Sequence, residues 1–193
     1  LPADRQCAIS FLEGIEELSQ AQASSLTIEK QPLELHSFLK HIIERFSKLF
    51  LDKGVLLQFE CDEKLMINAD PDKLSQVVIN LLSNALKVTE KNGNVLVGAG
   101  RKGSNVFIRV SDTGSGIKQE DLPFIFERFY KGTEGGLGIG LAIVKELIDA
   151  HAGRIEVQSE YGKGSTFTIF IPSEQFSQFS TIPSKSIQNL LIF

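Results

Sequence analysis

Two clusters of glycine constrain this chain more than any other feature of its sequence. The chain has 193 residues and 16 glycines, and several of the glycines crowd into residues 93–116 and 132–140. Glycine allows sharp backbone turns and leaves room for another molecule to approach. The first cluster contains DTGSGI (112–117), directly after a strand-like segment, and the second contains GGLGIGL (135–141), at the start of a helix-like segment. Glycine-rich loops between regular elements favour a ligand site.

Composition and charge limit the classes of protein to consider. Apolar residues make up 42% of the chain and charged residues 23%, which is the balance of a globular protein with one or two domains. The net charge is -4, so no basic surplus favours nucleic acid or an anionic membrane surface. No apolar run approaches the ~20 residues that span a bilayer, and the first residues, LPADRQC, lack the features of a secretion signal.

The two cysteines predict a reducing compartment. Cys7 and Cys61 do not form a close metal-type pair, and two thiols in a chain this long do not make a disulfide scaffold. We therefore expect a cytoplasmic domain without nucleic-acid or membrane contacts, in a parent protein that is soluble or anchored in the cell membrane.

Hydrophobic periodicity predicts alternating helices and strands. Helices are predicted over 5–23, from Pro32 to about Gly54, over 71–90 and over 138–153. Strands are predicted over 55–61 and 64–68, and hairpins over 94–112 and 154–172. Because hairpins supply most of the strands, the expected fold class is α/β (α+β), a two-layer sandwich of a mixed, mostly antiparallel sheet with helices on one face. The domain boundary is placed around residue 28. Residues 173–193 show neither the helical nor the strand period of apolar residues.

One polar line on the predicted helix 71–90 is unusual. Asn80, Asn84 and Lys87 are spaced i, i+4 and i+7, so they share one face, although asparagine is a mediocre helix former. The simplest interpretation is a solvated face. Two amide oxygens and an ammonium group on one line also suit Mg²⁺ and a phosphate group.

The two glycine-rich loops suit the two ends of a nucleotide. Asp112 stands at a strand end beside Gly114 and Gly116, and a carboxylate there is an acceptor for the exocyclic amine of a purine. An Asp-capped turn is the simpler alternative. Gly138 and Gly140 lie around a helix start, where unpaired N–H groups and the helix dipole favour an anion such as phosphate.

The segment between the loops is rich in aromatic residues. Phe124, Phe126, Phe129 and Tyr130 lie within seven positions, and such density is more often core than ligand contact. Because a polar, glycine-rich stretch follows, a hydrophobically anchored lid over 130–137 is the interpretation that we favour.

The three histidines are not predicted to be nucleophiles. His36 and His41 have no acidic neighbour placed to orient them. His151 is predicted at a helix end, where a partial positive charge suits the dipole.

In order along the chain, four motifs resemble the catalytic ATP-binding region of bacterial sensor histidine kinases, in the Bergerat-fold ATPase superfamily. DPDKLSQVVINLLSNALK resembles the asparagine box, DTGSGI the first glycine box, PFIFERFYKG the phenylalanine box and GGLGIGLAIVK the second glycine box. The resemblance implies ATP and Mg²⁺ as ligands, with Asn84 on Mg²⁺, Asn80 and Lys87 in catalytic positions facing the phosphates, and Asp112 on adenine. The other implied nucleotide contacts are Gly114, Gly116, Ile117, Tyr130, Lys131, Gly136, Leu137, Gly138 and Gly140. Where the family often has an aromatic residue that stacks on adenine, this chain has Val88, which implies either weaker base stacking or stacking by Ile117.

The resemblance also implies a domain organisation and partners. Residues 5–28 are similar to the end of the second helix of the family's dimerisation hairpin, so 1–28 is assigned to that hairpin and 29–172 to the ATP-binding domain. The family's phosphoacceptor motif, His-Glu-Leu-Arg-Thr-Pro, does not occur in the sequence. The expected partners are therefore histidine-bearing dimerisation helices of a homodimer and the receiver domain of a response regulator.

Three functions from different classes remain open at this stage. The leading one is an ATP-dependent protein histidine kinase of a two-component system. The second is hydrolysis, as in DNA gyrase and the heat-shock chaperones of this fold, which place a Glu where this chain has Asn80; without that base, hydrolysis is disfavoured. The third is a non-catalytic partner-binding module, against which the intact glycines and Asn84 argue.

Overall fold

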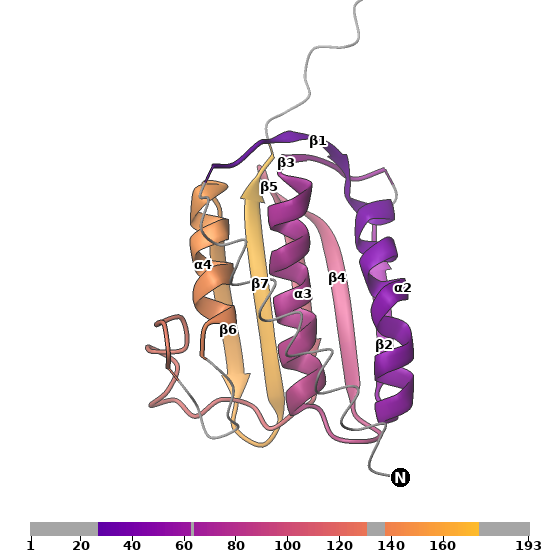
Figure 1. Ribbon diagram of the computed structural model, residues 1–193, viewed down its shortest axis with the longest axis vertical. Coiled ribbons are helices and arrows are strands. Elements are labelled where there is room, and N and C mark those ends of the chain that lie inside the picture. Colours follow the sequence, from indigo (N-terminus) through magenta and orange to yellow (C-terminus); the bar gives the residue numbers. More distant parts are fainter. Residues whose placement is uncertain (1–26, 63, 131–137, 174–193) are drawn as a thin grey trace, which may run out of the picture.

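The protein is built as a layer of helices on one face of a mixed sheet. The computed structural model describes residues 27–62, 64–130 and 138–173. In these residues, helices α2 (Leu35–Lys53), α3 (Pro71–Val88) and α4 (Gly140–Ala150) lie side by side, with α3 in the middle (Figure 1). In sheet order, the strands behind them are β2 (Leu56–Cys61), β4 (Asn94–Lys102), β5 (Asn105–Asp112), β7 (Gly164–Pro172) and β6 (Arg154–Glu160).

Strand pairing in the sheet is antiparallel except at one edge. β4 pairs with β5, β5 with β7, and β7 with β6, all antiparallel, whereas β2 runs parallel to β4. A parallel pair needs a crossover, and here the chain passes through β3 (Met66–Ala69) and α3 between β2 and β4. The predicted mixed, mostly antiparallel sheet with helices on one face is confirmed.

The prediction of a helix starting at Pro32 is wrong, because residues Gln31–Glu34 form strand β1. β1 pairs antiparallel with β3, apart from the five-stranded sheet, with Gln31 opposite Ala69. Glu34 then has an extended backbone, and its carboxylate accepts the N–H groups of His36 and Ser37 at 3.0 and 2.8 Å. This cap starts α2 at Leu35.

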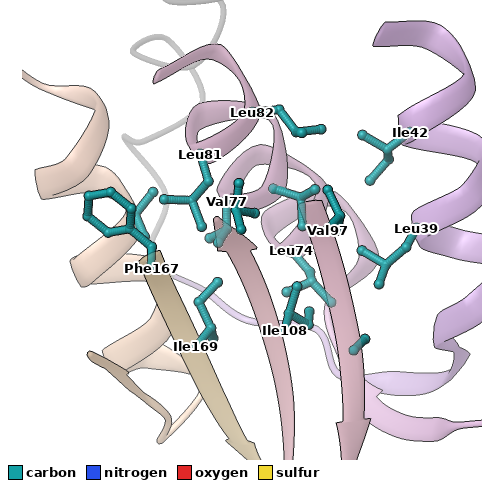
Figure 2. Packing of buried hydrophobic residues seen from close by; sticks show 14 of the residues in the cluster. Leu39, Ile42, Leu74, Val77, Leu81, Leu82, Val97, Ile108, Phe167 and Ile169 are labelled. Atoms are coloured by element: carbon teal, nitrogen blue, oxygen red, sulfur yellow. The ribbon is translucent and has the colours of Figure 1, made fainter. Parts of the chain in front are cut away.

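The core lies between α3 and the sheet. Along α3, buried apolar side chains recur on one face, and along the strands they occupy alternate positions. Leu74, Val77 and Leu81 of α3 are at most 1% exposed and point toward Val97, Ile108 and Ile169 of β4, β5 and β7 (Figure 2). Leu39 and Ile42 extend this packing to α2. Because the apolar face of α3 is fixed in this way, its polar line has a fixed direction.

Asp70 caps the start of α3, as predicted. Its Oδ1 accepts the N–H groups of Asp72 and Lys73 at 3.0 and 3.1 Å, and its Oδ2 accepts that of Glu29 at 2.9 Å. Burial alone would raise the pKa of Asp70, but these three N–H groups outweigh it and hold the pKa below its usual value. One carboxylate therefore ties the start of the described chain to α3.

His151, directly after α4, is neutral rather than the partly charged group that we predicted. It is fully buried, its Nδ1–H donates to the carbonyl of Leu147 at 2.7 Å, and its Nε2 accepts the N–H of Asp70 at 3.1 Å. Burial lowers the pKa of His151. The imidazole needs one donor and one acceptor for this bridge between α4 and α3, and only its neutral form has both.

The free energy of unfolding should fall when the pH drops below about 6.5, the pKa of an unfolded histidine. Because the folded-state pKa of His151 is lowered, the unfolded state binds more protons than the folded state in this range. For one proton, the free energy of unfolding then falls by at most about 1.4 kcal/mol per pH unit. Denaturant unfolding at pH 7.5 and 5.5 measures the change. His151→Gln should reduce the change in the free energy of unfolding between the two pH values. His41→Gln, which replaces an exposed residue of α2, should keep that change. An equal change in all three proteins would contradict the assignment of the effect to His151.

Candidate functional site

The polar line of α3 lies on the flank of the helix that faces α4. Asn80 is only 3% exposed, and a Cβ added at Gly140, the first residue of α4, would lie 3.5 Å from its Oδ1. Asn84 and Lys87 are half-buried. The solvated-face interpretation is therefore wrong for Asn80, which lies where α3 meets the start of α4.

Asp112 is a buried carboxylate at the end of β5. It is 8% exposed, and its Oδ1 accepts the N–H of Gly114 at 2.9 Å and that of Ser165 at 3.3 Å. Two N–H donors on one oxygen fix the plane of the carboxylate. The bond to Gly114 is the predicted turn, and the bond to Ser165 joins that turn to β7.

The first glycine loop packs on the carboxyl end of α3. The N–H of Ser115 donates to the carbonyl of Val88 at 3.3 Å. A Cβ at Gly114 would lie 2.5 Å from the same carbonyl oxygen, so no larger residue fits this approach. The loop that follows Asp112 is thereby held against the last residue of α3.

The second glycine loop meets the aromatic segment at Gly138. The Gly138 carbonyl accepts the N–H of Phe129 at 2.8 Å, and a Cβ at Gly138 would lie 2.4 Å from the carbonyl oxygen of Tyr130. The two ends of the predicted lid thus touch. The predicted contacts Lys131, Gly136 and Leu137, and the lid prediction for 130–137 apart from Tyr130, lie outside the described residues.

The aromatic segment is anchored by only some of its apolar side chains. Ile125 is buried and Phe126 packs on the core, whereas Phe124 and Phe129 are 44% and 70% exposed. Arg128 binds Glu146 of α4 through two hydrogen bonds of 2.8 Å. The segment is thus fastened to α4 with two aromatic rings outside the core.

Tyr130 is engaged with a partner that was not predicted. Its hydroxyl donates to Oδ1 of Asp121 at 2.6 Å, and its ring lies 5.8 Å from that of Phe124. The hydrogen bond to Asp121 raises the pKa of Tyr130. The described contacts of this hydroxyl are therefore within the aromatic segment.

Two serines of the last hairpin complete the surroundings of Asp112 and were not predicted. Ser159 of β6 accepts the N–H of Ile117 at 2.8 Å, and its hydroxyl lies 3.0 Å from that of Ser165 of β7. Both stand in the alternating rows that otherwise hold apolar side chains, such as Val157 and Phe167. The sequence signal that could have identified them is a polar residue at a position where the strand pattern expects a core residue.

The residues of the site fit a nucleotide that shares a metal ion with the protein. Among the described residues, no group of three or more His, Cys, Asp and Glu could hold a metal. The amide oxygens on α3 are neutral, hard ligands that suit Mg²⁺ when phosphate oxygens and water complete its shell. Around them, glycines replace side chains at both places where a loop approaches α3.

Residues 69–175 match the family described as histidine kinase-, DNA gyrase B- and HSP90-like ATPases. The matched residues include both glycine loops and the polar line of α3. The chain belongs to this ATPase family. ATP is accordingly the nucleotide that the family assigns to the site.

Within the ATPase family, the similar proteins are sensor histidine kinases. The circadian input-output histidine kinase CikA of Synechococcus elongatus is 33% identical over 191 residues, which is 94% of this chain and 25% of CikA. The sensor histidine kinase ZraS of Escherichia coli is 36% identical over 143 residues, or 74% of this chain and 31% of ZraS. The chain therefore spans well under half the length of these relatives. The predicted similarity to sensor histidine kinases is confirmed.

A solved structure confirms the fold of this ATPase domain. Histidine kinase ThkA, in complex with the response regulator TrrA, matches with a TM-score of 0.71 at 26% identity, covering 86% of this chain and 48% of ThkA. No helix within the described ranges is long and apolar enough to cross a membrane.

Proposed function

We propose that this domain binds Mg-ATP and transfers the γ-phosphoryl group to a histidine on dimerisation helices, from which a response regulator receives it. One observation carries the proposal: the polar line of α3 lies between the two glycine loops. Gly140 of the second loop approaches the side chain of Asn80, and Gly114 of the first loop approaches the carbonyl of Val88. A site arranged in this way can hold the phosphates at one end and the base at the other. The similar kinases support this choice within the ATPase family.

Each predicted site residue has a role that its position allows. Asn84 would supply an amide oxygen to Mg²⁺, which when bound offsets phosphate charge, and Lys87 would bind a phosphate oxygen. Asp112 would accept a hydrogen bond from the adenine amine, with Ile117 against the base. In the transfer, the bond from the γ-phosphorus to the β,γ-bridging oxygen breaks as a bond to an imidazole nitrogen forms, and ADP leaves.

Transfer is favoured over hydrolysis by Asn80. Hydrolysis needs a base that takes a proton from water, and an amide cannot do this at neutral pH. Asn80 is buried beside Gly140, where a carboxylate in its place would face the second glycine loop. ATP bound here would therefore react with water only slowly, and its γ-phosphoryl group would be transferred when an acceptor from outside this site is present.

The acceptor is not one of the described histidines. His151 is buried, and its two ring nitrogens hold Leu147 and Asp70. His36 and His41 belong to α2, which α3 separates from α4 (Figure 1). We therefore propose that residues 1–28 belong to a dimerisation hairpin, that 29–172 form the ATP-binding domain, and that the acceptor histidine lies on the hairpin. The complex of ThkA with TrrA supports a receiver domain as the second partner.

Nucleotide titration tests the site. Asp112→Ala should weaken ADP binding about tenfold or more with and without Mg²⁺, because a hydrogen bond to a charged group contributes about 1.5–3 kcal/mol. Asn84→Ala should weaken it only when Mg²⁺ is present, because its role is to bind the metal. Calorimetry with Mg²⁺ and with a chelator separates the two effects.

Ser111→Ala is the matched control, because Ser111 precedes Asp112 on β5 and lies on the opposite face of the sheet. It should bind ADP like the unmodified chain. Unchanged affinity in both Asp112→Ala and Asn84→Ala would contradict the site and favour a non-catalytic module.

A further inference from the structure

A row of three polar residues crosses the helix-facing side of the sheet at the end near the glycine loops. In register, Ser159 of β6 is opposite Ser165 of β7, which is opposite Asp112 of β5. Two residues along each strand, the same face has Val157, Phe167 and Val110 in register. Since the neighbouring row is apolar, and Ser165 and Asp112 are 6% and 8% exposed, the polar row needs a reason other than solvation.

Ser159 lies at the β6 end of this row, and the hydrogen-bonding capacity of its hydroxyl is used in full. It accepts the N–H of Ile117 at 2.8 Å and contacts the Gly164 carbonyl and the Ser165 hydroxyl, each at 3.0 Å. A hydroxyl has one donor and two acceptor sites. The consistent assignment is that Ser159 donates to Gly164 and accepts from Ile117 and Ser165.

We infer that Ser159 is a positioning residue that sets the base specificity of the site. This inference rests on the proposed function, in which Asp112 reads the adenine amine and Ile117 contacts the base. Ser159 holds Ile117 directly, through its N–H. It holds Asp112 through Ser165, whose hydroxyl bonds Ser159 and whose N–H donates to Oδ1 of Asp112 at 3.3 Å. One hydroxyl therefore fixes the distance between the group that reads the base edge and the group that lies on the base.

The loop that carries Ile117 is attached to the last hairpin at further points. The N–H of Gly162 donates to the Ser115 carbonyl at 2.6 Å, and the Gln119 side chain donates to the Ser159 carbonyl at 3.4 Å. These bonds do not involve the Ser159 hydroxyl. Removing that hydroxyl should therefore loosen the base-reading geometry while the loop remains attached to the hairpin.

The test compares ADP with inosine diphosphate, which has an oxo group and a ring N–H where ADP has its amine and a bare ring nitrogen. The unmodified chain should prefer ADP, because an oxo group facing the Asp112 carboxylate has no hydrogen to donate. In Ser159→Ala, the ratio of the two affinities should fall about tenfold, roughly one charged hydrogen bond. Partial unfolding lowers the apparent affinity for both nucleotides equally, so it does not change the ratio.

Two variants distinguish positioning from general damage. Ser159→Thr keeps the hydroxyl and should restore most of the ratio. Thr166→Ala removes a hydroxyl that lies 2.9 Å from that of Ser111 between β5 and β7, adjacent to Ser165 but on the other face of the sheet, and it should leave the ratio unchanged.

The outcomes separate this inference from the proposed function. If the unmodified chain does not prefer ADP over inosine diphosphate, the assignment of Asp112 to the base fails. If the unmodified chain prefers ADP and Ser159→Ala keeps the full ratio, the role of Ser159 is wrong while the nucleotide site stands. An equal fall of the ratio in Thr166→Ala would also overturn the inference, because any hydroxyl of the hairpin would then have the same effect.

Discussion

Incubated with Mg-ATP labelled at the γ-phosphate, this chain alone should incorporate no label, and a separately supplied dimerisation hairpin with the family's histidine should become labelled. The residues that we propose to bind and orient ATP are among those described, with Asn80 beside the second glycine loop and Asp112 beside the first. The described residues provide no accessible histidine near the second glycine loop, since His151 is buried, and His36 and His41 belong to α2, which α3 separates from α4 (Figure 1). Positioning and charge neutralisation carry phosphoryl transfer, so the added histidine should be sufficient.

The stability of the label identifies the acceptor. The phosphorus–nitrogen bond of phosphohistidine is labile in acid and survives base. Phosphoserine is stable in acid and labile in base. A hairpin with alanine in place of the histidine is the control and should stay unlabelled. Rapid release of phosphate by the chain alone, or an acid-stable label, would contradict the proposal in favour of an ATPase or a serine kinase.

Gly164→Ala should lower the free energy of unfolding by about 3 kcal/mol or more, because backbone strain and a steric clash combine at this position. Gly164 has a φ of +118°, which residues with a side chain rarely adopt. A Cβ there would lie 2.1 Å from the Asp112 carbonyl oxygen, so β5 or β7 must move. Because Gly164 also accepts the hydrogen bond of Ser159, nucleotide binding should weaken in the protein that remains folded. Denaturant unfolding and calorimetry measure the two effects.

Gly103→Ala provides the matched comparison. Gly103 lies in the turn between β4 and β5 with a φ of +62°, and a Cβ there would meet no atom within 4 Å. Its substitution should cost about 1 kcal/mol, the left-handed penalty alone, and leave ADP binding intact. Equal losses of stability in the two variants would show that the contact with Asp112 is not the cause.

Local pattern was sufficient to predict α3 and its polar line. Helical spacing places Leu74, Val77 and Leu81 on one face whatever the rest of the fold, and the structure buries all three. Asp70 before Pro71 is a start signal that needs no tertiary information. The line of Asn80, Asn84 and Lys87 was therefore visible in the sequence, and only the burial of Asn80 beside α4 required the structure.

Features that depend on pairing between distant segments were not predicted. β1 has only four residues and is stabilised by β3, more than thirty residues away along the chain, so local preference favoured a helix there. Ser159 and Ser165 look like ordinary strand residues until the register places them beside Asp112. Likewise, the neutral state of His151 depends on the N–H of Asp70, 81 residues away.

Glu29 and Lys30 attach the start of the described chain to one end of the domain, at Asp70 and His151. The N–H of Glu29 is held by Asp70, and the ammonium group of Lys30 donates to the His151 carbonyl at 3.2 Å, so the chain enters at the amino end of α3 and the carboxyl end of α4. The first glycine loop packs at the other end of α3, whose 18 residues span about 27 Å. A rotation of about 10° about the entry point would sweep that end through about 5 Å, a length set by the helix rise. A small change of angle at Glu29 and Lys30 would thus be converted into a displacement as long as a helical turn at the end of the domain that carries Asp112.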